Sequence, residues 1–89
     1  MDDSTTLSLL EELAVRLGMK IRYEPLMIDG AAQLGGFCRI KGEAFVIIHQ
    51  DATLGEKIHI LIDAVKRHDL SDIFVMPSLR HILDDQDEI

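Results

Sequence analysis

The segment FCRI-KG-EAFVIIH, which ends at His49, constrains the fold of this chain more than any other segment. β-Branched and aromatic residues flank Lys41-Gly42 on both sides, and this pattern predicts a β-hairpin with a two-residue turn. The second arm is apolar at every position from Ala44 to Ile48. Such a run is expected of a central strand that is covered on both faces.

The chain before the hairpin predicts one helix and one strand. Apolar residues recur at helical spacing over residues 5–17, and Ser4 or Thr5 is expected to cap the helix at its start. Gly18 is suited to the left-handed turn that ends a helix. Residues 19–24 then alternate strictly between apolar and polar side chains, which predicts a strand with one solvated face.

The chain after the hairpin predicts two further helices. Thr53 and Glu56 have the spacing of a capping box, in which each side chain bonds the backbone amide of the other residue. They open a predicted helix over residues 54–68. A short extended piece follows at residues 73–75, and Pro77 suits the first position of a short C-terminal helix.

These elements predict a single α+β domain over residues 1–89, because the chain is too short for two independent cores. Two main helices are expected to pack a mainly antiparallel, three-stranded sheet, and the C-terminal helix is expected to cover one edge of that sheet. The acidic ends, residues 1–4 and 84–89, are expected to fray. The three predicted strands are residues 19–24, 36–41 and 43–49.

The charge and composition of the chain disfavour some classes of partner and indicate its compartment. Sixteen acidic residues against nine basic ones give a net charge of -7, which disfavours binding to nucleic acid. No apolar run approaches the roughly 20 residues that span a bilayer, so no membrane partner is expected. Cys38 is the one cysteine and no signal peptide is recognisable at the start, which indicates the cytoplasm.

The predicted helix over residues 54–68 contains two of the four histidines. On a helical wheel, His59 and Asp63 are neighbours on one flank, whereas His68 lies across the helix from His59. His59 and Asp63, with His49 from the strand end, form a candidate divalent-metal site. The alternative is a hydrogen bond between His59 and Asp63 on the helix surface.

The sequence contains two other candidate sites, one at Cys38 and His49 and one in the loop Gly30–Gly36. Cys38 and His49 lie about 13 Å apart along the predicted hairpin, too far for a nucleophile and its base, and Cys38 is expected to be a buried, inert thiol. The loop Gly30–Gly36 is rich in glycine but matches neither phosphate-binding motif. A small-ligand site there is a weaker hypothesis.

Ile60 falls opposite the core stripe on the same wheel, and Ala64 lies beside it. An apolar residue at such a position is either incidental or part of a surface that a partner covers. Ile60 and Ala64 therefore form a candidate interface, with an uncovered sheet edge as the other candidate for self-association.

The order of LGMKIRYEPL, LGGFCRIKGEAFVIIHQDAT and the helix that begins near Thr53 resembles the core of small zincin-like peptidases of the phage-immunity-regulator type (ImmA/IrrE-like). The pattern also resembles that of short bacterial proteins. The chemistry of the peptidase family requires the motif H-E-x-x-H. Ile60 and Asp63 stand where that motif needs its Glu and its second His. The resemblance therefore implies a scaffold without its catalytic residues.

These observations predict a non-catalytic cytoplasmic module that binds another protein or itself, with a homodimer expected. No catalytic residue and no cofactor is assigned. The alternative is a divalent-metal-binding protein or a remnant metallohydrolase that uses His59 and Asp63.

Overall fold

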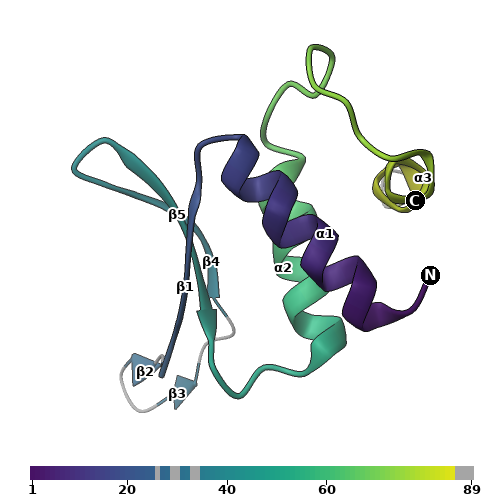
Figure 1. Ribbon diagram of the computed structural model, residues 1–89. Coiled ribbons are helices and arrows are strands. Elements are labelled where there is room, and N and C mark those ends of the chain that lie inside the picture. Colours follow the sequence, from purple (N-terminus) through teal and green to yellow (C-terminus); the bar gives the residue numbers. More distant parts are fainter. Residues whose placement is uncertain (26, 29–30, 33–34, 86–89) are drawn as a thin grey trace.

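The computed structural model describes residues 1–25, 27–28, 31–32 and 35–85. In these ranges, three helices and a three-stranded mixed sheet form an α+β fold (Figure 1), which confirms the predicted class. The helices are α1 (Asp3–Arg16), α2 (Leu54–Val65) and α3 (Pro77–Asp85). The sheet contains β1 (Lys20–Glu24), β4 (Gly35–Ile40) and β5 (Glu43–His49), and a separate two-stranded ladder joins β2 (Met27–Ile28) to β3 (Ala31–Ala32).

The strand β5 lies at the centre of the sheet, in the order β1-β5-β4. It pairs antiparallel with β4 and parallel with β1, so β1 and β4 are the two edges. The hairpin has the expected register, because Cys38 lies opposite Phe45. Lys41 and Gly42 have φ angles of 52° and 83°. Both residues are thus left-handed, as the favoured two-residue hairpin turn requires.

Helices α1 and α2 lie side by side on one face of the sheet, with α1 against β1 and α2 against β4 and β5 (Figure 1). Val46 and Ile48 point from β5 into the core between the layers and are fully buried. Phe45 and Ile47 alternate with them on the outer face and are half-buried. The expectation that β5 is covered on both faces was therefore wrong, since no second layer of helices lies on the outer face in the described ranges (Figure 1).

Charged side chains partly shield the outer face of the sheet instead. Lys20 and Arg22 lie over the ring of Phe45, 5.8 and 5.9 Å from its centroid. The same two cations form ion pairs of 2.9 Å with Glu43 and Glu24. This arrangement gives the aromatic ring favourable contacts without a second layer.

The prediction that Ile60 faces away from the core was wrong. Ile60 is 9% exposed and Ala64 is fully buried. The reason is that α2 contacts the sheet on one side and α1 on another, so the buried side of the helix spans an arc of about 200°. The candidate interface at Ile60 and Ala64 therefore lies inside the fold.

The N-terminal end of the chain leads directly into the first helix. Asp2 caps α1 by accepting a hydrogen bond of 2.8 Å from the Thr5 amide, and this bond lowers the pKa of the Asp2 carboxyl. The helix therefore starts at Asp3, two residues earlier than predicted. Gly18 follows its end with a φ of 90°, as expected.

The C-terminal half contains both predicted helices, but the end of α2 and the packing of α3 differ from the prediction. The Thr53–Glu56 capping box is present, with both reciprocal hydrogen bonds. The second helix ends at Val65 rather than at residue 68. The third helix packs against α1, remote from the sheet (Figure 1), so the expectation that it covers a sheet edge was wrong. Asp84 and Asp85 are the last two residues of this helix, and residues 86–89 of the predicted acidic end lie outside the described residues.

Candidate functional site

The structure does not bring the three predicted metal ligands together. His49 accepts a hydrogen bond of 2.9 Å from the Asp51 amide, and Asp63 accepts one of 3.3 Å from Arg67. His59 is exposed on α2. Among the residues that the structure describes, no group of three His, Cys, Asp or Glu side chains is placed to hold a metal ion. The hypothesis of a site at His49, His59 and Asp63 was therefore wrong.

The other two sites considered from the sequence also remain without support. Cys38 is half-buried rather than buried. It lies opposite Phe45 in the hairpin, whereas His49 lies four residues further along β5, so the strand register keeps the two side chains apart. The loop Gly30–Gly36 lies partly outside the described residues. In the ranges given above, no helix is long and apolar enough to cross a membrane.

One polar cluster connects α1, β1 and α2. The Tyr23 hydroxyl donates a hydrogen bond to the Glu11 carboxylate, and the Lys57 ammonium lies 5.2 Å from the centre of the Tyr23 ring. Partial burial and, secondarily, this bond to Glu11 raise the pKa of Tyr23 above its ordinary value. These contacts fasten three elements of the fold to one another.

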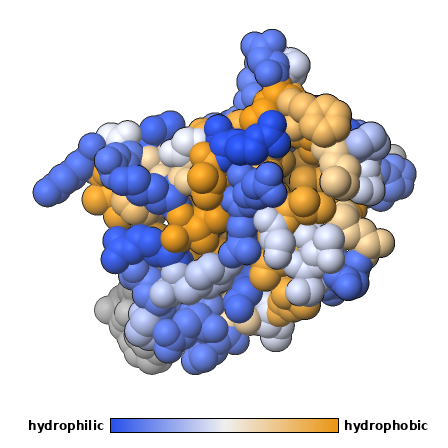
Figure 2. Space-filling model, viewed as in Figure 1, coloured by the Kyte–Doolittle hydropathy of each residue, from blue (hydrophilic) through white to orange (hydrophobic). Residues whose placement is uncertain are grey.

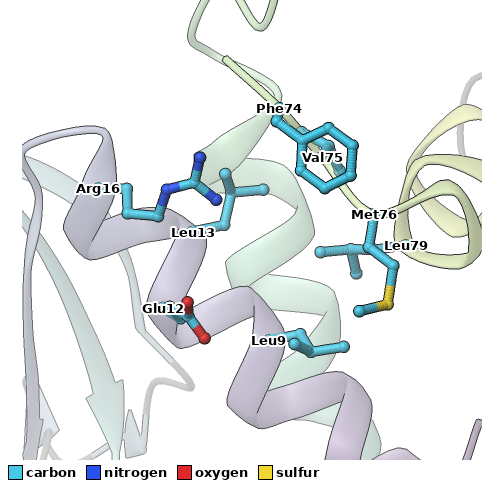
Figure 3. A pocket seen from close by; sticks show the side chains of 8 residues that line it. All are labelled: Leu9, Glu12, Leu13, Arg16, Phe74, Val75, Met76 and Leu79. Carbon is cyan, nitrogen blue, oxygen red and sulfur yellow. The ribbon is translucent and has the colours of Figure 1, made fainter.

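The most distinctive surface is an apolar hollow of about 200 Å³ beside α1 (Figure 3). Figure 2 shows apolar side chains gathered on this face of the molecule. The hollow has two unlike walls. The helix wall consists of Leu9, Glu12, Leu13 and Arg16 from α1. The opposite wall, called the loop wall here, consists of Phe74, Val75 and Met76 from the segment before α3, together with Leu79 from α3 itself.

The loop wall presents two large apolar side chains to solvent. Val75 is buried and anchors the extended segment before α3. Its neighbours Phe74 and Met76 are 72% and 44% exposed while they also line the hollow. The sequence predicts an extended piece here but does not by its pattern identify these side chains as a surface. The signal available in the sequence was the position of Phe74 and Met76 on either side of Val75, just before Pro77.

The geometry of the hollow is the basis for assigning it a role. No protein-family model matches the chain, and no curated protein or solved structure is significantly similar to it.

Proposed function

We propose that this chain is a non-catalytic protein-interaction module that binds its partner at the hollow between α1 and the loop wall. The observation that carries the proposal is the exposure of Phe74 and Met76 beside an apolar cavity. Aromatic residues and Met are enriched at the centres of protein interfaces, where they fill pockets from which water is excluded. Isolated exposed apolar residues are normal on protein surfaces, whereas several exposed apolar side chains at the edge of one hollow are typical of a binding surface.

The described groups whose pKa is shifted take part in local structure and lie outside the hollow. The groups with a lowered pKa serve local structure: Asp2 caps a helix, and Asp69 accepts a hydrogen bond from the Ser71 amide. Tyr23 has a raised pKa but fastens three elements of the fold. None of these groups lines the hollow. The proposal is also compatible with the resemblance to zincin-like peptidases, since the chain lacks the H-E-x-x-H motif.

The cytoplasm is the compartment that fits this proposal. The free thiol of Cys38 is compatible with a reducing environment. An acidic module with a pI of about 4.8 is expected to avoid non-specific contacts with nucleic acid.

Site-specific photo-crosslinking in the cells that make the protein tests the proposed surface. We expect a photoreactive phenylalanine analogue at position 74 to give a defined covalent adduct with a protein. The same analogue at position 15 is the matched control, because Val15 is 60% exposed but does not line the hollow. Equal or absent adducts at both positions would show that the hollow is not a protein-binding site.

A further inference from the structure

We propose that the occupant of the hollow is a second copy of this chain, and that Phe74 of each copy packs against the helix wall of the other, beneath the partner's Arg16. This inference rests on the proposed function and specifies its partner. It replaces the predicted contact through Ile60, which is buried.

The cation contacts of the aromatic side chains are the first observation that supports this occupant. The chain has four aromatic residues, and three of them have a Lys or Arg over the ring at 5.2–5.9 Å from its centroid. Within the described residues, Phe74 has no such contact, although it is the most exposed of the four. The observed pairs are Lys57 over Tyr23, Lys20 and Arg22 over Phe45, and Arg39 and Arg67 over Phe37.

The two unlike walls of the hollow are the second observation. The loop wall presents Phe74, whereas the helix wall presents the exposed guanidinium of Arg16 above Leu9 and Leu13 (Figure 3). A two-fold axis that runs along the hollow, between its two walls, brings each wall of one copy against the opposite wall of the other. Phe74 of one copy then contacts Leu9 and Leu13 of the other, and the guanidinium of Arg16 lies near its ring. The apolar surroundings exclude water, which strengthens a cation–π contact.

The local charge of the hollow does not add to the repulsion between two copies. The chain carries a net charge of -7, so two copies repel at long range. The lining of the hollow contains one acid, Glu12, and one base, Arg16, so its own net charge is zero. Two copies that meet there therefore place neutral surfaces in contact, and the excess negative charge remains elsewhere on the molecule.

A single tryptophan at position 74 tests both the partner and the contact. The chain contains no Trp, so Phe74→Trp introduces one fluorophore at the proposed interface. Trp also forms the strongest cation–π contacts among aromatic side chains. As the concentration of the purified full chain rises, we expect the mass to double from 10.0 kDa and the indole emission to shift to the blue over the same range.

Two further variants provide the controls. Val15→Trp places an indole at an exposed apolar position on α1, outside the hollow, and its emission should not shift during association. In the Phe74→Trp background, Arg16→Gln should weaken association roughly five- to thirty-fold, since two cation–π contacts are lost per dimer. Arg16→Lys should retain part of the affinity.

Three outcomes would overturn the inference. A mass of 10.0 kDa at all concentrations would exclude a second copy, and the proposed function would still stand if position 74 formed an adduct with a different protein. A doubled mass with an unshifted indole emission would show that the two copies associate through another surface, for example the open edge of β1 or β4. An unchanged affinity in Arg16→Gln would exclude the contact between Arg16 and Phe74.

Discussion

Gly35, at the start of β4, occupies a backbone position that excludes any side chain. Its φ is 124°, and a Cβ atom placed there would lie 2.0 Å from the carbonyl oxygen of Ile47 on β5. The oxygen belongs to the backbone of the sheet and the position of a Cβ atom is fixed by the backbone of residue 35, so neither can rotate away. We expect Gly35→Ala to lower the free energy of unfolding by about 3–5 kcal/mol, measured by urea denaturation, because it combines backbone strain with overpacking.

Gly36 provides the matched control at the next position of the same strand. A Cβ atom there meets nothing within 4 Å, and its φ is not in the left-handed region. Gly36→Ala should therefore change the free energy of unfolding by no more than about 1 kcal/mol. Similar losses in both variants would contradict the proposed role of the close approach between Gly35 and Ile47.

At the scale of elements, the cluster of Glu11, Tyr23 and Lys57 fastens α1, β1 and α2 to one another. Burial and the bond to Glu11 raise the pKa of Tyr23 in the folded chain above its ordinary value of 10.0. Above about pH 10, the unfolded chain has released this proton while the folded chain still holds it. Unfolding then releases a proton, so rising pH favours the unfolded state. The stabilising contribution is complete below about pH 10 and is lost as the pH rises further.

This pH dependence is measurable because Tyr23 is the one tyrosine and the chain has no Trp. We expect the ultraviolet absorbance of tyrosinate to appear at higher pH in the folded chain than in the chain unfolded by urea. Above about pH 10, the wild type should lose stability faster than Tyr23→Phe. Glu11→Gln should lower the pKa of Tyr23 only in part, since burial is the larger cause. A folded chain that titrates near pH 10 would contradict the described hydrogen bond.

The charge of the whole molecule predicts how salt affects the proposed dimer. Raising the ionic strength from about 0.01 to about 0.15 M shortens the screening length from about 30 to about 8 Å. Since each copy carries -7, salt should reduce the long-range repulsion and strengthen association several-fold, as measured by sedimentation. Phe74→Gln should remain a monomer under both conditions. Association that weakens with salt would instead indicate attraction between opposite charges.

Local patterns in the sequence were sufficient to predict the elements of this fold. The turn at Lys41-Gly42 sets the register of the hairpin, and the capping box at Thr53 and Glu56 starts α2 where it was expected. These features depend on contacts between residues at most a few positions apart. The α+β class followed from them, because helices and strands in a chain of this length must share one core.

Only the tertiary structure decided which surfaces are covered. The helical wheel placed Ile60 outside the core because it assumed one buried face, but α1 and the sheet contact α2 from different sides. The parallel pairing of β1 with β5 and the packing of α3 on α1 also join segments that are far apart in the chain. Phe74 forms part of a hollow only because α1 lies opposite it. The periodicity of a sequence shows which side chains of one element share a face. Which of these faces are buried depends on how the elements pack against one another.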